Sequence, residues 1–218
     1  MSFKNVLCFG SLNPDLVYFI DKLPSPGGDI QSKKYFIRPG GTAINCAENI
    51  AMWNINTAVR GNSIGNDELG TYLIKHLNNL KIVHKDVTKD NTITPTCSIY
   101  IDGSGERTII SSGYEESNWS SLNTIQDYDS LLIDRYSIKY VKEELKKVKK
   151  NNDIFLTQAG YEEEIDYKID FLVVSKNEIE VKEANEILEK GMAKWILLTS
   201  SNLPARLLST DGVLEIVP

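Results

Sequence analysis

Residues 38–70, RPGGTAINCAENIAMWNINTAVRGNSIGNDELG, decide how we interpret the rest of the chain. A Gly-Gly turn is followed by small and apolar residues at helical spacing that begin at Ala43, and then by a strand pattern and a second helix pattern. Gly41 lets the backbone approach a ligand closely, and Asn45 in the first helical turn can both donate and accept hydrogen bonds. Such a pair would suit a polyhydroxylated ligand. An ordinary glycine turn beside a satisfied polar residue explains the same pattern.

Short apolar segments that alternate with helical patterns continue through the chain on both sides of this stretch. The segments LLID, IFLT, FLVV and WILLT have the composition of buried strands, and charged helical patterns separate several of them. This alternation predicts an α/β fold with a mostly parallel sheet flanked by helices. Residues 15–39 and 96–111 differ, because they contain closely spaced strand patterns broken by turn residues. We therefore predict a single domain over residues 1–218, with 15–39 and 96–111 forming a small projecting β-sheet lid.

The composition excludes several classes of protein. The chain has 218 residues, a net charge of −6 and a sequence pI of about 5.1, which argues against a nucleic-acid partner. Its three cysteines are far apart and odd in number, and its two histidines show no metal-ligand spacing. No apolar stretch approaches the roughly 18 residues that a membrane span needs. We expect a cytoplasmic protein with free thiols and no membrane partner.

Several short motifs occur in order within residues 6–70. They are a strand ending in Gly-Ser, then Asn13 and Asp15, then PGG-x-x-x-N-x-A-x-x-x-A, and then G-N-x-x-G-N-D-x-x-G. This order resembles the first signature region of the ribokinase-like (PfkB) carbohydrate kinases. The resemblance implies a kinase that transfers phosphate from ATP to a hydroxyl of a sugar or nucleoside. It also implies that Asn13, Asp15, Gly41 and Asn45 contact the substrate.

Two charged residues are weaker candidates for the substrate site. Arg107 lies in a G-E-R-T strand similar to one in the family's projecting sheet. Asp134 ends a predicted buried strand, and open α/β sheets bind ligands at the carboxyl ends of their strands. Either residue could face the sugar or the phosphates. A charged hairpin flank and a surface ion pair are the ordinary explanations.

The segment NEIE, which follows the strand FLVV, resembles the family's N-x-x-E motif. The resemblance implies that Asn177 and Glu180 help to bind Mg²⁺ and ATP, with Glu180 as the metal-associated carboxylate. By itself, this motif is equally well explained by a helix cap and an ordinary helical glutamate. Thr199 matches the first residue of the family's nucleotide turn, T-x-G-x-x-G, but the chain continues with SSNLP and keeps neither glycine. We therefore expect the nucleotide loop to differ from that of the family.

The family's second signature, D-T-x-G-A-G-D, supplies the general base and does not occur in residues 1–218. We therefore assign no catalytic residue in the given chain and expect the C-terminal part of the family fold to be absent from it. Two functions stay open, an ATP- and Mg²⁺-dependent sugar kinase and a non-catalytic sugar- or nucleoside-binding descendant. A dinucleotide-binding protein is disfavoured, because no G-x-G-x-x-G follows the first strand. Ribose, fructose, ketodeoxy sugars and nucleosides are all open as ligands, and we expect a homodimer formed through the β lid.

Overall fold

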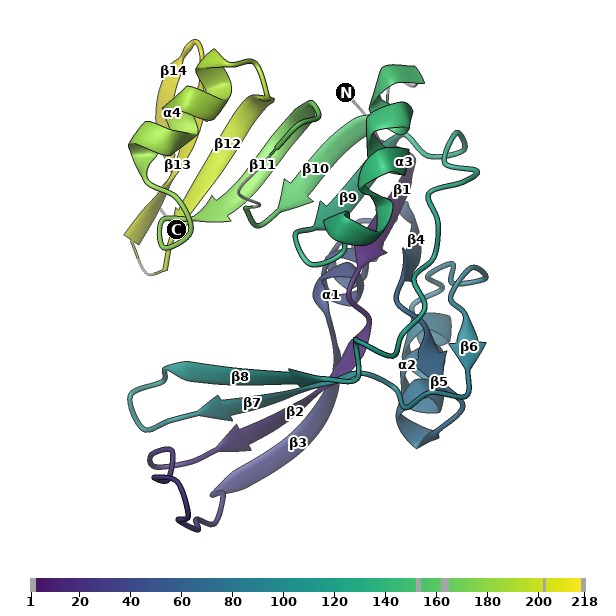
Figure 1. The fold of residues 1–218 in the computed structure, drawn as a ribbon, viewed down its shortest axis with the longest axis vertical. Coiled ribbons are helices and arrows are strands. Elements are labelled where there is room, and N and C mark those ends of the chain that lie inside the picture. The colour runs from purple at the N-terminus through teal and green to yellow at the C-terminus, as the bar shows by residue number, and fades with distance from the viewer. Residues whose placement is uncertain (1–2, 152–153, 162–164, 202, 217–218) are drawn as a thin grey trace.

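The computed structural model describes residues 3–151, 154–161, 165–201 and 203–216. Its main sheet has the strand order β14-β13-β12-β11-β10-β9-β1-β4 (Figure 1). The strands of this sheet are β1 (Asn5–Gly10), β4 (Asn56–Gly61), β9 (Ser130–Asp134), β10 (Phe155–Ala159), β11 (Ile169–Ser175), β12 (Ala193–Ser200), β13 (Leu203–Ser209) and β14 (Gly212–Ile216).

The strands from β4 to β12 pair in parallel, whereas β13 and β14 form an antiparallel hairpin at one edge. The prediction of a mostly parallel sheet is therefore confirmed. The carboxyl ends of the parallel strands meet along one edge of the sheet, and this edge faces the second, smaller sheet (Figure 1).

Helices cover both faces of the main sheet. They are α1 (Thr42–Ala51), α2 (Glu68–Asn79), α3 (Ile138–Asn151) and α4 (Val181–Glu189). Strand β1 shows why both faces are apolar: Val6 and Cys8 join the core beneath α1 and α2, while Leu7 and Phe9 join the core beneath α3 and α4. Within the described residues, no helix is both long and apolar enough to span a bilayer.

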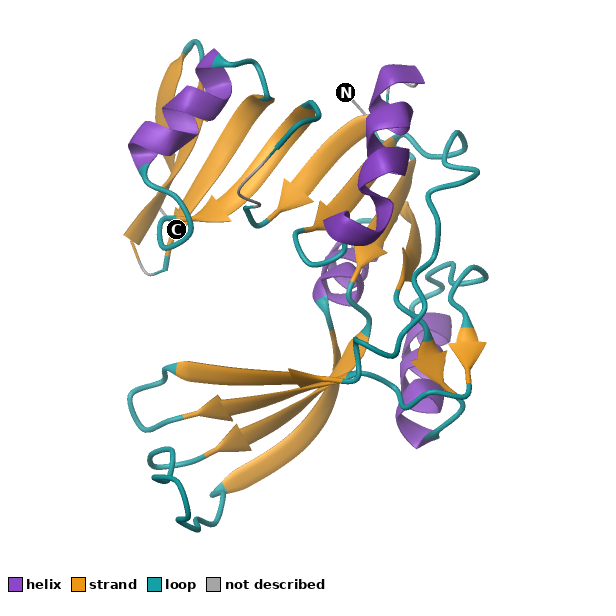
Figure 2. Ribbon diagram, in the orientation of Figure 1, coloured by secondary structure: helices purple, strands orange, loops and turns teal. Residues whose placement is uncertain are grey.

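A second sheet has the order β3-β2-β7-β8 and projects from the main body (Figure 2). Its strands are β2 (Asn13–Phe19), β3 (Lys34–Gly40), β7 (Thr96–Ile101) and β8 (Arg107–Ser112). Strand β2 pairs antiparallel with β3 and parallel with β7. We call this sheet the lid. The short strands β5 (Ile64–Gly65) and β6 (Lys89–Asp90) form a separate pair.

The structure moves the boundaries of two elements that the sequence patterns suggested. The helical pattern of residues 179–190 predicts that α4 begins at Ile179, but Glu180 has an extended backbone (φ −84°, ψ 163°) and is the N-cap. Ile179 therefore lies in the preceding turn, where it is buried. The sequence pattern also predicts a last hairpin over residues 206–218, but β13 begins at Leu203 because its pairing with β12 continues to Ser200. The final residues of that expected range, 217 and 218, lie outside the described residues.

Candidate sugar-binding site

A cavity of about 570 Å³ lies between the lid and the main body. Strands β2 and β3 contribute Asp15 and Arg38 to its wall, and β8 contributes Arg107. The start of α1 contributes Gly41 and Asn45. Asn13 lines the same cavity, so five of the six residues that we predicted to bind substrate share it, Asp134 being the exception.

A chain of hydrogen bonds fixes the position of the Asp15 carboxylate. Tyr114 Oη donates to Asn13 Oδ1 at 2.6 Å, and Asn13 Nδ2 donates to Asp15 Oδ1 at 2.9 Å. Arg38 Nε and Nη2 donate to Asp15 Oδ2 at 3.2 and 3.1 Å. Because each oxygen of Asp15 already has a protein donor, the carboxylate is held in one orientation and keeps further lone pairs for a ligand.

Tyr114 is a residue that the sequence patterns did not identify. It lies in the loop after β8, which Gly113 begins with a φ of +86°. Burial, and then the neighbouring Cys97, raise the pKa of Tyr114, so its hydroxyl stays protonated and remains a donor to Asn13. Asn13 is 1% exposed. Its amide is already used by Tyr114 and Asp15, so its main effect is on the orientation of Asp15.

The two glycines before α1 let the helix approach the first loop. Gly41 has a φ of +85°, and a Cβ atom there would lie 2.2 Å from the Ser11 carbonyl oxygen. A Cβ atom on Gly40 would lie 2.3 Å from the carboxyl group of Asp15. Thr42 N–H then donates to Ser11 Oγ at 3.0 Å. These positions therefore require glycine, and the requirement explains the PGG motif in physical terms.

Asn45 lies at the cavity with a side-chain amide that is free within the described residues. Its side chain is exposed and lines the cavity, and its amide group makes no hydrogen bond within the described part of the chain. Its backbone carbonyl accepts a hydrogen bond from Asn49 Nδ2 at 2.7 Å. The Asn45 amide is thus available to a ligand, in contrast to the amide of Asn13.

Asp134 lies behind the cavity wall. Its Oδ2 accepts hydrogen bonds from Ser11 N at 2.8 Å and Ser11 Oγ at 2.9 Å, and its Oδ1 accepts one from Ser137 N at 2.9 Å. It is 1% exposed and is not among the residues that line the cavity. The Asp134 carboxylate, which we predicted to contact a ligand, therefore binds to other residues of the protein. It links the loop after β1 to the residues just before α3.

Aromatic and basic side chains from the main body line the cavity opposite the lid. Trp119 and Tyr140 stack with ring centroids 4.3 Å apart and an angle of 11° between their planes. Arg135 forms an ion pair with Glu178, and its Nη2 donates to Tyr136 Oη at 2.8 Å. The hydrogen bond with Tyr136 raises the pKa of Arg135. These residues belong to no sequence motif. The only sequence feature that predicted a ligand contact from the main body here was the strand end at Asp134.

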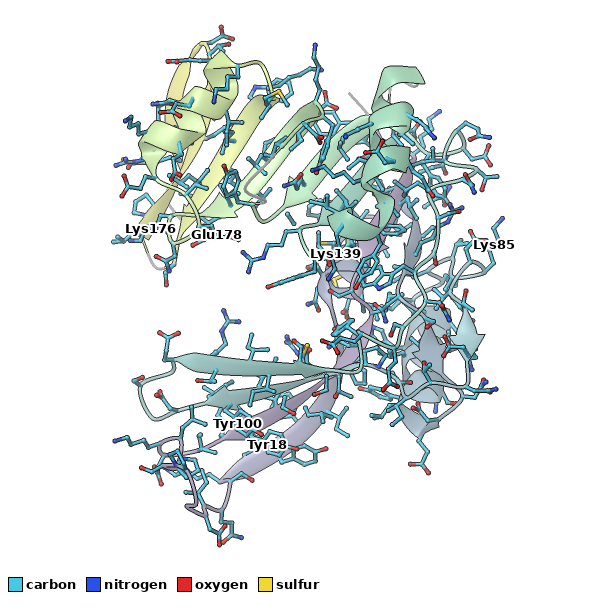
Figure 3. The ribbon with its side chains drawn as sticks, in the orientation of Figure 1. Tyr18, Lys85, Tyr100, Lys139, Lys176 and Glu178 are labelled. Carbon is cyan, nitrogen blue, oxygen red and sulfur yellow. The ribbon has the colours of Figure 1, made fainter. Side chains whose placement is uncertain are left out.

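The residues predicted to bind the nucleotide lie at the carboxyl ends of β11 and β12, at the same edge of the main sheet. Figure 3 shows the neighbouring Lys176 and Glu178 at the end of β11, on the side that faces the lid. Asn177 is exposed, and Glu180 is the N-cap of α4. Thr199 Oγ1 donates to the carbonyl oxygen of Val174 at 3.1 Å. Asn177, Glu180 and Thr199 do not line the large cavity.

A second cavity of about 320 Å³ lies beside these residues. It is lined by Lys176, Val181, Leu198, Ser200, Leu203, Pro204, Arg206 and Glu215. Ser201 has a φ of +49°, so the chain takes a left-handed conformation at the position where the family motif has its first glycine. Serine therefore takes, at this one position, the left-handed conformation that glycine adopts most easily.

The described residues contain no cluster of three or more His, Cys, Asp or Glu side chains that could hold a metal. Mg²⁺ commonly binds through one or two carboxylates, with water and phosphate oxygens completing its shell. Glu178 is engaged by Arg135 and by the N–H of Ser175, which donates to it at 2.8 Å. Glu180, the carboxylate predicted to associate with the metal, is exposed and forms a capping box with Glu183, whose Oε2 accepts a hydrogen bond from the Glu180 N–H at 2.9 Å.

Comparison with known proteins identifies the family. The model described as "pfkB family carbohydrate kinase" matches residues 4–218. The chain belongs to the pfkB family. A search of curated proteins returns no match.

Solved structures agree with this assignment at the level of the fold. Ribokinase from Thermotoga maritima is 20% identical with a TM-score of 0.75, and the match covers 97% of this chain and 77% of that one. Arabidopsis thaliana ribokinase complexed with ribose and ATP is 19% identical with a TM-score of 0.74, covering 98% and 78%. Cryptococcus neoformans var. grubii ribokinase in complex with ADP is 19% identical with a TM-score of 0.79, covering 100% and 79%. The pfkB chain described here therefore has the ribokinase fold.

Proposed function

We propose that this pfkB protein transfers the terminal phosphoryl group of ATP to a hydroxyl of a sugar or nucleoside. The observation that carries the proposal is the fixed carboxylate of Asp15 at the wall of a cavity shared with Gly41 and Asn45. A carboxylate accepts strong hydrogen bonds from two adjacent hydroxyls, and the Asn45 amide adds a donor and an acceptor. Asn13 serves this site by orienting Asp15.

The phosphoryl donor lies, in this proposal, at the carboxyl ends of β11 and β12. The ATP and ADP named for the two ribokinases above support a nucleotide in this protein. Asn177, Glu180 and Thr199 would hold it, and the second cavity offers apolar walls next to Lys176 and Arg206. Mg²⁺ beside Glu180 would neutralise phosphate charge. Because Ser201 and Pro204 replace both glycines of the family's nucleotide turn, we expect this loop to differ in shape from that of the family.

The residues of this chain contribute mainly by alignment. Asp15 and Asn45 hold the acceptor, so that one hydroxyl points toward the edge of the main sheet, and the lid limits access of water. The acceptor hydroxyl must also lose a proton. We assign no residue among 1–218 as the general base that removes this proton.

The test is a coupled assay of ADP formation with a panel of pentoses, hexoses, nucleosides, sugar acids and sugar phosphates. The electrospray mass of the purified protein is compared with the 24.5 kDa of residues 1–218, so that the length of the assayed chain is known. The proposal predicts ADP formation that depends on one member of the panel and on Mg²⁺. Acceptor-independent ADP formation, or none with any acceptor, contradicts it.

A non-catalytic sugar- or nucleoside-binding protein is the second candidate. Ser201 and Pro204 at the two glycine positions of the nucleotide turn favour it, since proline cannot donate a backbone hydrogen bond to a phosphate. This candidate predicts that a sugar or nucleoside raises the melting temperature while ATP is neither bound nor consumed. Binding of ATP by calorimetry would exclude it.

A further inference from the structure

The large cavity carries more positive charge than binding of neutral hydroxyls requires. Four cationic side chains line it, from Arg38, Arg107, Arg135 and Lys139, against a single carboxylate from Asp15. The whole chain has the opposite balance, with a net charge of −6. The gathering of cations at this cavity therefore differs from the average surface of the protein, and it creates a local field that attracts anions.

Two of these cations are already compensated. Arg38 is paired with Asp15 at 3.1 Å, and Arg135 is paired with Glu178. Arg107 and Lys139 have no carboxylate partner within the described residues. Lys139 Nζ lies 4.9 Å from the centroid of the Tyr140 ring, a contact that orients the ammonium group but leaves its charge in place.

The two uncompensated cations come from opposite walls. In the lid, Asp15 of β2 lies opposite Cys97 of β7. Four residues farther along β7, Ile101 lies opposite Arg107 of β8. Arg107 therefore lies on the same face as Asp15, four positions farther from the base of the lid, or about 13 Å along the strands. Both residues line the cavity.

Lys139 approaches from the other wall, in the first turn of α3 (Figure 3). Asp15, Arg107 and Lys139 line one cavity, so an acceptor whose hydroxyls bind at Asp15 shares that cavity with both cations. We propose that the acceptor is an anionic sugar, with a phosphate or carboxylate at the end remote from the Asp15 contact, and that Arg107 and Lys139 bind this group. The inference rests on the proposed sugar site.

Nucleotide phosphates are the other source of negative charge near this cavity. Arg135, through its ion pair with Glu178, is turned toward the sheet edge proposed for the nucleotide. Arg107 is carried by the distal end of a lid strand, and Lys139 lies beside Trp119 and Tyr140. For this reason we assign Arg107 and Lys139, rather than Arg135, to the acceptor.

The test is calorimetric titration in the absence of nucleotide, so it gives a result whether or not the protein transfers phosphate. The probes are ribose and ribose 5-phosphate, fructose and fructose 6-phosphate, glucose and gluconate, and inorganic phosphate. The variants are Lys139→Gln and Arg107→Gln, and the control is Lys85→Gln, an exposed lysine away from the cavity (Figure 3). A non-hydrolysable ATP analogue is titrated separately into each protein.

At least one phosphorylated or carboxylated sugar should bind more tightly than its neutral parent and than inorganic phosphate. Each cavity variant should weaken that binding about tenfold, which is the usual effect of one charge-assisted hydrogen bond. Lys85→Gln should bind like the wild type, and the affinity for the ATP analogue should not change.

Three results would overturn the inference. One is a neutral sugar that binds as tightly as its anionic derivative. Another is loss of ATP-analogue affinity in parallel with the loss of sugar affinity, which would assign the two cations to the nucleotide. The third is no binding of any anionic sugar at millimolar concentration. Absence of ADP formation with normal anionic-sugar binding would instead count against the proposed kinase activity alone.

Discussion

At the scale of residues, the site shows how far a local motif carries a functional prediction. Asp15, Gly41 and Asn45 were identified from spacing and resemblance, and all three line one cavity. Asn13 lines it too, but the structure commits its amide to Asp15 and to Tyr114, 101 residues later in the chain. No sequence pattern links residues so far apart, and so the positioning of Asp15 could not be predicted.

Replacing Tyr114 with Phe tests that positioning. The variant removes the donor to Asn13 Oδ1 and leaves a buried acceptor unpaired, which we expect to cost about 1 to 3 kcal/mol of unfolding free energy. The freed Asn13 amide should also let Asp15 reorient, weakening sugar affinity about fivefold, as measured by calorimetry at a temperature where the protein stays folded. Tyr140→Phe is the control, because Tyr140 lines the same cavity and its hydroxyl makes no hydrogen bond within the described residues.

A purely structural role for Tyr114 would give a different pair of results. Urea unfolding would then show lower stability, while the dissociation constant for the sugar would equal that of the wild type. Agreement between the two tyrosine variants in both measurements would likewise remove Tyr114 from the site.

At the scale of elements, the start of α2 could be predicted from the sequence, whereas the start of α4 was predicted two residues too early. Asp67 precedes apolar residues at helical spacing, which predicts that it caps a helix. The structure confirms this, since α2 begins at Glu68 and Gly70 N–H donates to Asp67 Oδ1 at 2.7 Å. Its other partner, Thr94, donates through Oγ1 at 2.6 Å and through N–H at 2.8 Å from a distant loop. Contacts between residues far apart in the chain could not be predicted, and strand order is one example. The alternating pattern predicted parallel strands, but not that β1 lies between β4 and β9.

The cap of α2 should make stability depend on pH. Burial alone would raise the pKa of Asp67, but hydrogen bonds from Thr94 and Gly70 outweigh it and lower the pKa below its ordinary value. The ionised carboxylate therefore stabilises the folded state fully above the unfolded pKa of about 3.9, and this stabilisation is lost as pH falls through the lower folded pKa. Asp67→Ala should lower the unfolding free energy by about 1 to 2 kcal/mol at pH 7, and by less at pH 3.

Urea unfolding of both proteins between pH 7 and pH 3 measures this difference. Glu68→Ala, in the first turn of the same helix, is the control, because it removes a carboxylate that does not cap the helix. A deficit in Asp67→Ala that stays constant over the pH range would show that the Asp67 charge contributes nothing to the cap.

At the scale of the whole molecule, the lid separates two surfaces with different roles. Adjacent residues of β8 point to opposite faces: Ile109 lines the cavity, and Ile110 belongs to the other face. They are 53% and 54% exposed. The outer face also carries Tyr18, whose ring stacks on Tyr35 at 4.8 Å and on Tyr100 at 5.2 Å (Figure 3). A surface of this composition is typical of a protein contact.

We expect this outer face to form the homodimer predicted from the sequence. Ile110→Glu places a charge in the contact and should shift the protein to monomer, as measured by sedimentation velocity over a range of concentrations. Ile109→Glu changes the neighbouring residue on the cavity face and should leave the dimer intact. A monomeric wild type, or equal effects of the two variants, would contradict an interface on this face.

The central claim is that the cavity beneath the lid binds a sugar through Asp15. The most direct test is calorimetric titration of wild type, Asp15→Ala and Asp21→Ala with the tightest-binding sugar of the panel. Asp21 is an exposed lid aspartate paired with Lys33, so its variant controls for loss of a charge from the lid. We predict that Asp15→Ala weakens binding at least about tenfold and that Asp21→Ala does not. Equal affinity of wild type and Asp15→Ala would contradict the claim.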